Sequence, residues 1–134
     1  MINANKIKKQ KRIRRHRRIR AKIRGTGQKP RFSVFRSNKH IFLQLIDDEK
    51  GKTIVSVGDF QSNAGRPRAD AKKVKTKVKA KINKTESAFS VGKKLAELAK
   101  KKKIKYAIFD RGGYAYHGRV KAAAEGARAG GLIF

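Results

Sequence analysis

The sequence contains no cysteine and no long apolar run. Without cysteine the chain forms neither disulfides nor thiolate metal sites, which fits a reducing cytosol. No apolar stretch approaches the roughly 18 residues that span a bilayer, and the basic N-terminus has no apolar segment of the kind found in a secretory signal. We therefore expect a soluble, cytoplasmic protein without a membrane partner.

Acidic residues are also scarce. The 134 residues include nine Asp or Glu against 38 Lys or Arg, which gives a formal net charge of +29. This excess favours binding to the phosphate backbone of a nucleic acid, where release of condensed counterions drives affinity and makes it depend on salt. A membrane surface is the weaker alternative, because the isoleucines of the N-terminal segment are too sparse for the apolar stripe of an interfacial helix.

The positive charge is densest at the N-terminus. The first 24 residues contain twelve Lys or Arg and no acid, and they include the run KKQKRIRRHRRIR. Such a block of like charges repels itself and buries no core, so we expect it to be disordered in the free protein and ordered by a polyanion. The remaining residues, 25–134, carry 26 basic residues and all nine acids, a net charge near +17.

The length allows one domain after this tail. We assign residues 1–25 to a basic tail and 26–134 to an α/β domain with one modest core. Two segments rich in β-branched and aromatic residues, Arg31–Ser37 and His40–Asp47, flank a polar pair and predict a β-hairpin. After a turn, the alternation in Lys52–Val57 predicts a third antiparallel strand, so the three strands form a meander.

Two helices are expected next. Apolar residues at three- and four-residue intervals predict the first within the lysine-rich segment 66–84, ending near Asn83; they are Ala71, Val74, Val78 and Ile82. In the second helix Thr85 is the expected N-cap, and Lys100–Lys103 close the C-terminus, where they complement the helix dipole without any need for RNA. Its expected core face consists of Ala88, Val91, Leu95, Leu98 and Ala99.

The C-terminal part predicts a strand, a loop and a helix. Ile104–Asp110 has the length and composition of a buried strand reached by a crossover, and the glycine-rich loop Arg111–Gly118 follows it. The inward residues of the last helix are expected to be Val120, Ala123, Ala124 and Ala127, with two glycines ending it. The apolar segment Leu132–Phe134 is expected to pack back on the domain or to add to a sheet edge.

The hairpin is a candidate RNA-binding element. Phe32 and Phe35 are three positions apart and so lie on opposite faces of a regular strand, which leaves one ring to stack on a base or to meet a helix. Donors suited to phosphate and sugar lie beside these rings, namely Arg31, Arg36, Ser37, Asn38, Lys39 and His40.

The glycine-rich loop is a second candidate. Tyr114, Tyr116 and His117 alternate with small residues between Arg111 and Arg119, a pattern that suits irregular or single-stranded RNA. Free amides at the start of the following helix would also attract anions. The alternative is that the glycines only permit a tight turn while both tyrosines cover the core. We favour the functional interpretation, because the loop follows the carboxyl end of a strand, where α/β folds tend to bind ligands.

Three segments together resemble the bacterial L18 family of large-subunit ribosomal proteins. They are KPRFSVFRSNKHIFLQLIDD, SVGKKLAELA and, most specifically, FDRGGYAYHGRVKAAAEGARAGGLIF. The resemblance covers nearly the whole chain and is loose between Gly58 and Thr85. It implies a ribonuclease-H-like core, no cofactor and no bound metal. It also implies a structural protein of the central protuberance that binds 5S rRNA, links it to 23S rRNA and adjoins the other proteins that bind 5S rRNA.

The resemblance also implies which residues contact RNA, and these fall in the three segments already singled out. In the basic tail they are Lys8, Lys9, Lys11, Arg12, Arg14, Arg15, His16, Arg17, Arg18, Arg20, Lys22 and Arg24. In the hairpin they are Arg31, Ser33, Arg36, Ser37, Asn38, Lys39 and His40. In the loop they are Arg111, Gly112, Gly113, Tyr114, Tyr116, His117, Gly118 and Arg119.

Two other classes of function compete with this one. A two-metal nuclease needs clustered carboxylates, and Asp47, Asp48 and Asp110 lie at predicted strand ends, where side chains from different strands can converge. Nine acids spread among 38 cations argue against a dense acidic centre, and Asp110 is more simply an ion-pair or loop-orienting partner of Arg111 or Arg119. A nonspecific nucleoid protein is the third class, and it predicts similar affinity for any duplex.

Overall fold

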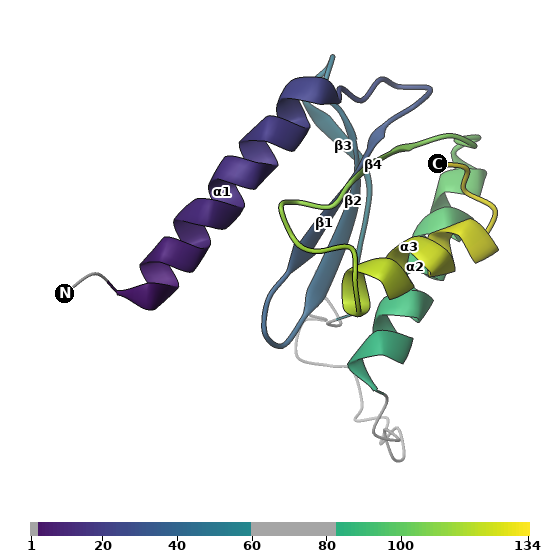
Figure 1. Cartoon of the computed structure of the whole chain (residues 1–134). Helices are drawn as coiled ribbons and strands as arrows, with labels where there is room; N and C mark the ends of the chain where they lie inside the picture. Colours follow the sequence, from purple (N-terminus) through teal and green to yellow (C-terminus); the bar gives the residue numbers. More distant parts are fainter. Residues whose placement is uncertain (1–2, 60–82) are drawn as a thin grey trace, which may run out of the picture.

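A four-stranded mixed sheet forms the centre of the molecule (Figure 1). The computed structural model describes residues 3–59 and 83–134. The strands are β1 (Arg31–Arg36), β2 (Ile41–Asp47), β3 (Lys52–Gly58) and β4 (Ile108–Asp110), in the order β3-β2-β1-β4. The first three pair antiparallel, and β4 pairs parallel to β1. The predicted meander, crossover and α/β class are confirmed.

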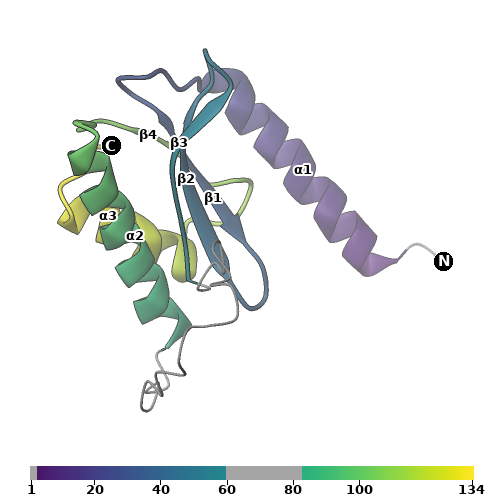
Figure 2. The ribbon, with the colours of Figure 1, turned by 180° about the vertical axis from the view of Figure 1, so that it is seen from behind.

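Two helices, α2 (Lys84–Lys101) and α3 (Arg119–Ala129), cover one face of this sheet (Figures 1 and 2). They pack closely because glycine occupies the contact points. A Cβ at Gly92 of α2 would collide with the carbonyl oxygen of Ala123, and a Cβ at Gly126 of α3 would collide with that of Phe89. The two backbones therefore approach at positions where no side chain fits.

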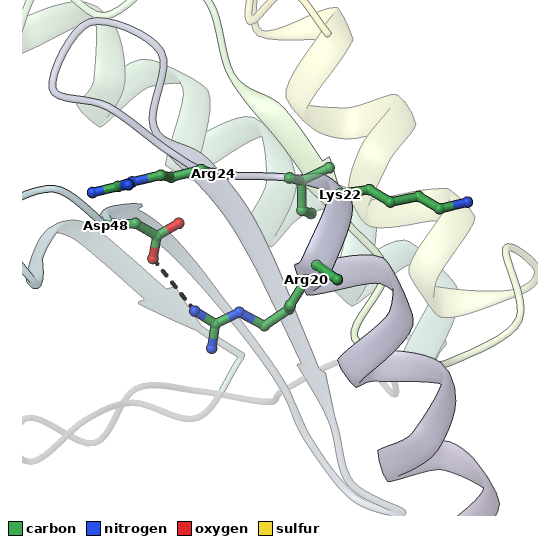
Figure 3. Close-up of a pocket in the computed structure, with 6 residues that line it drawn as sticks. Arg20, Lys22, Arg24 and Asp48 are labelled. Carbon is green, nitrogen blue, oxygen red and sulfur yellow. Dashed lines mark ion pairs between the residues drawn. The ribbon is translucent and has the colours of Figure 1, made fainter.

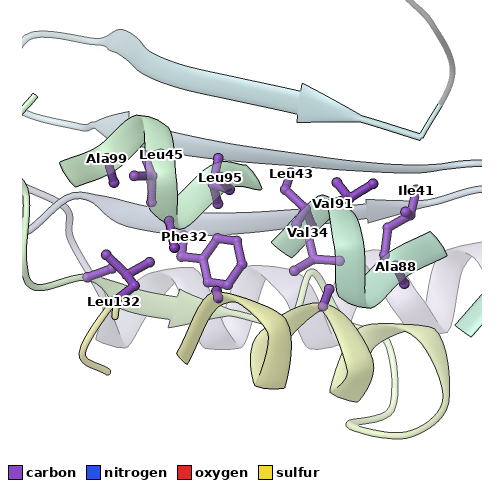
Figure 4. Close-up of a cluster of buried hydrophobic side chains, with 14 of the residues drawn as sticks. Phe32, Val34, Ile41, Leu43, Leu45, Ala88, Val91, Leu95, Ala99 and Leu132 are labelled. Carbon is purple, nitrogen blue, oxygen red and sulfur yellow. The ribbon is translucent and has the colours of Figure 1, made fainter. Parts of the chain in front are cut away.

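The hydrophobic core lies between these helices and the sheet (Figure 4). Alternate residues of β1 and β2 face it, because side chains of a strand alternate between the two faces. Phe32, Leu43 and Leu45 have no exposed surface, and Leu95 of α2 and Val120 of α3 meet them there. Phe35, on the opposite face of β1, is 54% exposed. The predicted separation of the two phenylalanines is confirmed.

Helix α2 differs from the prediction at its start and in its buried face. Asn83 is the N-cap and its side chain accepts a hydrogen bond from the Thr85 amide, so the assignment of Thr85 as cap is wrong. Leu98 is 37% exposed, whereas Gly92 and Ala96 are buried. Close contact with α3 determines which residues of α2 are buried, because at the contact points only small side chains fit.

The strand predicted for Ile104–Asp110 is shorter than expected. Only Ile108–Asp110 pairs with β1, because the chain still completes the end of α2: the Ile104 amide donates to the carbonyl of Ala99. Tyr106 instead forms an isolated parallel bridge with Ile133. The C-terminal segment thus both packs on the domain through the buried Leu132 and adds to a sheet edge.

The last helix agrees with the sequence analysis. All four inward residues of α3 are buried, and Gly130 caps it while Gly131 adopts a φ of 100°. The helix predicted within 66–84 falls, up to residue 82, outside the described residues. No helix in the described part of the chain has both the length and the apolar character needed to cross a membrane.

The basic N-terminal segment is a helix, α1 (Ala4–Lys22), so the expectation of a disordered segment is wrong for these residues. Asn3 caps it, and no residue of α1 is buried. In both views α1 lies on the side of the sheet opposite to α2 and α3 (Figures 1 and 2). Polar contacts hold α1 there. They join it to residues 110–113 and to Asp48, which are distant from most of α1 in the sequence.

Candidate RNA-binding surface

The middle of α1 is held by the glycine-rich loop after β4. Arg12 and Arg15 donate hydrogen bonds to the carbonyl oxygens of Gly112 and Gly113, at 3.4 and 3.1 Å. The Arg12 guanidinium also lies 4.7 Å from the centroid of the Tyr114 ring. Gly113 has a φ of 78°, and a Cβ there would lie 2.5 Å from the Arg12 carbonyl oxygen. Glycine therefore permits both the turn and the close approach of α1.

A buried charge cluster fixes the same helix further along. Asp110 has no exposed surface, and its Oδ2 accepts hydrogen bonds from Arg31 Nη1 at 2.7 Å and from His16 Nε2 at 3.1 Å. Its Oδ1 accepts from the Gly112 amide at 2.8 Å. The expected partners of Asp110, Arg111 and Arg119, are therefore wrong. One carboxylate joins α1, β1 and the loop.

Arg31 carries a second carboxylate on its other side. Asp48 accepts from Arg31 Nε at 2.9 Å and from Arg31 Nη2 at 3.1 Å. Burial lowers the pKa of Arg31, but the hydrogen bonds to Asp48 and Asp110 outweigh it and leave that pKa raised. The Arg31 hydrogen bond, helped by the Gly25 amide and by Arg20, holds the pKa of Asp48 below its usual range. Arg31 is only 4% exposed, so it organises the site from within.

The outward side of α1 carries cations that no acid of the helix neutralises. Lys8, Lys9, Lys11, Arg14, Arg17, Arg18 and Lys22 are all exposed. The helix has no acidic side chain, and from Lys8 to Lys22 these cations extend over about 21 Å at 1.5 Å per residue. A rigid row of cations of this length can neutralise several phosphates of one RNA helix at once, which is the source of salt-dependent affinity.

A cavity of about 360 Å³ lies where α1 ends (Figure 3). Arg20, Lys22, Arg24 and Asp48 line it, and Arg20 Nη2 lies 3.6 Å from Asp48 Oδ1. Figure 3 shows Lys22 pointing away from Asp48, while Arg20 reaches toward it. Because three cations line this cavity with one carboxylate that Arg31 already pairs, the cavity has an excess of positive charge and suits a phosphate group.

The hairpin presents a polar tip beside the loop. Asn38, Lys39 and His40 are exposed, whereas Ser33, Arg36 and Ser37 are half-buried. The Ser37 hydroxyl and the His40 backbone close the turn, and His40 Nδ1 lies 3.1 Å from Asp59 Oδ1. Arg119 Nη2 donates to the Ser37 carbonyl at 2.9 Å, so the start of α3 holds the tip in place. The structure therefore brings the hairpin and the loop together.

The two loop tyrosines have different positions. Tyr114 is 7% exposed, and its hydroxyl accepts from the Arg36 amide and donates to the Arg36 carbonyl, so it covers the core and extends the edge of β1. Tyr116 is 42% exposed, and His117 and Gly118 beside it are exposed as well. Gly112 and Gly113 are buried under α1. The alternative of a core role thus fits Tyr114, whereas the exposed ring is that of Tyr116, which packs edge-on against Phe109 and accepts a hydrogen bond from Arg128 at its hydroxyl.

The carboxylates at strand ends serve structure. Asp47 is 3% exposed and accepts from the amides of Glu49 and Lys50 in the turn before β3. Asp48 and Asp110 converge, as expected, and the side chain they share is Arg31. Within residues 3–59 and 83–134 no three His, Asp or Glu side chains gather in a way that would hold a metal ion.

Sequence reasoning missed Asp48 as part of the site. This residue fastens Arg31, the Gly25 amide and Arg20, and so joins the end of α1 to β1. It also missed Lys84, whose Nζ donates to the Asn38 carbonyl at 2.8 Å. The only available signal was an acidic residue directly after a strand in a very basic chain. That signal does not identify which cation it meets.

The sequence of the chain matches a family model and several known proteins. A family model for ribosomal L18 of archaea, bacteria, mitochondria and chloroplasts matches residues 6–134. A protein named large ribosomal subunit protein uL18 from Lactobacillus johnsonii is 49% identical over 123 residues, 92% of each chain. Proteins of the same name are 48% identical over 130 residues in Thermotoga petrophila, 95% of each chain, and 49% identical over 131 residues in Desulfosudis oleivorans, 98% of each chain.

Proposed function

The chain belongs to the ribosomal L18 family, and from this membership we propose that it binds 5S rRNA and helps to attach it to 23S rRNA in the central protuberance. As a member of the family it is a structural, non-enzymatic component of the large ribosomal subunit that binds rRNA and takes part in translation in the cytoplasm. The proposal goes further in two respects. It identifies 5S and 23S rRNA as the RNAs that the chain binds, and it includes contact with neighbouring ribosomal proteins that bind 5S rRNA.

The rigid attachment of α1 is the observation that carries the proposal. A disordered basic tail neutralises phosphates of any nucleic acid, whereas a helix locked at a fixed angle to the hairpin and the loop presents cations in one arrangement. His16 bonds Asp110 and Arg20 pairs with Asp48, and both carboxylates are held in turn by Arg31. The arrangement fits a folded RNA of matching shape better than an arbitrary duplex.

Within the proposal, residues 1–25 serve as the RNA-binding extension and residues 26–134 as the domain that orients it. The sheet order, a three-strand antiparallel meander with a fourth strand parallel to the first, supports the proposed ribonuclease-H-like core. The exposed cations of α1, the hairpin tip and the segment Tyr116–Arg119 are the proposed contacts. Arg31, Gly112, Gly113 and Tyr114 act indirectly, because they are buried and hold these contacts in position.

A charge-neutralisation experiment tests the role of α1. Replacing Arg14, Arg17 and Arg18 by Gln removes three exposed cations but none of the residues that anchor the helix. Three lost phosphate contacts should make the slope of log affinity against log salt shallower by about 2–3. The matched control replaces Lys93, Lys94 and Lys101 of α2, which are exposed on the other side of the sheet. Equal effects of the two triple variants would contradict the proposed surface.

A specificity experiment tests the choice of RNA. Filter binding should show that the intact chain prefers 5S rRNA to a random duplex of equal length, and that Tyr116→Ala or His117→Ala reduces this preference more than it reduces affinity for the duplex. Equal affinity of the intact chain for both RNAs would reject the proposal in favour of a nonspecific nucleic-acid-binding protein.

A further inference from the structure

The C-terminal edge of the sheet carries large apolar side chains that are open to solvent. Tyr106 and Ile133 are 52% and 54% exposed. A cavity of about 430 Å³ lies beside them, lined by Ile108, Phe109, Phe134 and Lys29 as well. This volume falls within the range of about 300–1,000 Å³ that is usual for small-ligand sites. None of the anchoring contacts of α1 described above uses these residues.

The floor of this cavity is rigid and aromatic. The rings of Phe109 and Phe134 are stacked, with centroids 5.5 Å apart and planes at 12°. Both also contact the fully buried Phe32 edge-on, with centroids 5.3 Å away. The core therefore holds the aromatic floor in place, and a planar ligand would meet a preformed surface and not a flexible one.

The chain itself already occupies the outer backbone edge here. The Ala107 amide donates to the Ile133 carbonyl at 3.0 Å, and the Ile133 amide donates to the Lys105 carbonyl at 2.9 Å. A peptide that adds a strand needs free backbone donors and acceptors, so its docking at residues 105–107 is disfavoured. What remains available is side-chain surface, and this favours stacking over strand addition.

The charges around the cavity are positive. Lys29 lines it, Lys105 is exposed next to Tyr106, and the Arg128 guanidinium lies 4.6 Å from the centroid of the Phe134 ring. Phe109 and Arg128 pack on the Phe134 ring, so the exposed Tyr106 ring is the one that can stack on a base. An exposed aromatic ring beside cations that bind phosphates is the combination found on surfaces that bind single-stranded nucleic acid. In both views the C-terminus and α1 lie on opposite sides of the sheet (Figures 1 and 2).

We propose that this C-terminal aromatic edge, formed by Tyr106, Ile133, Phe134 and Lys29, is a second RNA-binding surface that takes an unpaired base of a single-stranded segment. The inference rests on the proposed function, because it assigns the first RNA to α1, the hairpin and the loop. It gives the molecule a second RNA-binding surface, which lies away from α1 (Figures 1 and 2) and adjoins the loop where the Tyr116 ring packs edge-on against Phe109. Such an arrangement joins two RNA segments without any rearrangement of the protein.

The test uses the full chain saturated with 5S rRNA and a fluorescent oligouridylate of about eight nucleotides, a length within the usual range of single-strand sites. Anisotropy should show the oligouridylate binding to the preformed complex. Tyr106→Ala should weaken this binding by about fivefold or more, the effect of losing one stacked base, while Tyr106→Phe keeps the ring and should retain it. The matched control is Phe89→Ala, which removes another exposed ring, on α2.

Crosslinking of the unaltered chain provides a measurement that does not depend on the folding of a variant. A 4-thiouridine in the oligouridylate should attach to residues 105–109 or 132–134 when the 5S rRNA complex is irradiated. Complete displacement of the oligouridylate by 5S rRNA, or crosslinks confined to α1, would overturn the second surface. Preferential binding of an oligoglutamate peptide with the same dependence on Tyr106 would overturn it in favour of a protein partner.

The outcome separates this inference from the proposed function. A chain that does not bind 5S rRNA would contradict the proposed function, but dependence of oligouridylate binding on Tyr106 in the free chain would still support the second surface. Normal binding of 5S rRNA without any such dependence would contradict the second surface alone.

Discussion

Replacing Asp110 by Asn should destabilise the protein and loosen α1 from the domain. The two side chains have nearly the same shape, so the substitution leaves no cavity. An Asn can still accept from the Gly112 amide through its oxygen, but its NH2 group then faces the Arg31 guanidinium, which can only donate. His16 Nε2 can accept from that NH2 group only in its other tautomer. The substitution removes the charge from a fully buried site and leaves a buried guanidinium with one carboxylate in place of two.

The size of this effect follows from the burial of the cluster. Breaking a buried ion pair by removing one partner costs about 3–5 kcal/mol. Arg31 keeps its two hydrogen bonds to Asp48, so we expect the lower end, about 3 kcal/mol. That is a large share of the total stability of about 5–15 kcal/mol typical of a domain. The midpoint of thermal unfolding should fall by about 10–20 °C.

Urea unfolding followed by circular dichroism measures the change, with the slope of free energy against urea unchanged. The control is Glu125→Gln, the same change of carboxylate to amide at an exposed pair, where Lys121 Nζ lies 4.0 Å away. It should cost less than about 0.5 kcal/mol. Hydrogen exchange should also show faster exchange of the α1 amides in Asp110→Asn.

A loss below about 1 kcal/mol in Asp110→Asn, with the slope unchanged, would refute the view that this cluster stabilises the fold. Full destabilisation with unchanged exchange in α1 would refute the link between the cluster and the helix. The double variant Arg31→Met, Asp110→Asn should cost less than the sum of the two single variants, because removing the guanidinium also removes the uncompensated charge.

Three further predictions concern pH, helix packing and the loop. Arg31 lowers the pKa of Asp48 in the folded state, so in acid the unfolded chain binds more protons than the folded one. The stability from this pair should therefore be present above about pH 4 and lost below it. Urea titrations at pH 5 and about pH 2.5 should show a smaller loss of stability in Asp48→Asn than in the unaltered chain. Gly126→Ala should lower the free energy of unfolding by about 1–3 kcal/mol despite the better helix propensity of alanine, because its methyl group meets the Phe89 backbone; increased stability in the same denaturation assay would contradict the close packing. Tyr114→Phe should cost about 1–2 kcal/mol, because the Arg36 amide and carbonyl both lose a partner, and an unchanged melting temperature would contradict that role.

Local patterns in the sequence were sufficient for most elements of the domain. The alternation in Arg31–Asp47 and the spacing of small apolar residues in Arg119–Ala129 depend on strand and helix periodicity, which neighbouring residues encode. The position of a helix end was less accessible, since Asn83 and Thr85 are both residue types that favour an N-cap. Contact between α2 and α3, not propensity, determined that Gly92 is buried and Leu98 half-exposed.

The sequence by itself determined the large excess of positive charge, its concentration in the first 24 residues and hence the class of ligand, because charge is a property of composition. Only the tertiary structure decided that α1 is a fixed helix, that Arg31 is buried between Asp48 and Asp110, and that Tyr114 is covered while Tyr116 is open. These features depend on contacts between residues as many as 100 positions apart. Periodicity describes each segment alone, so it carries no record of which distant segments meet.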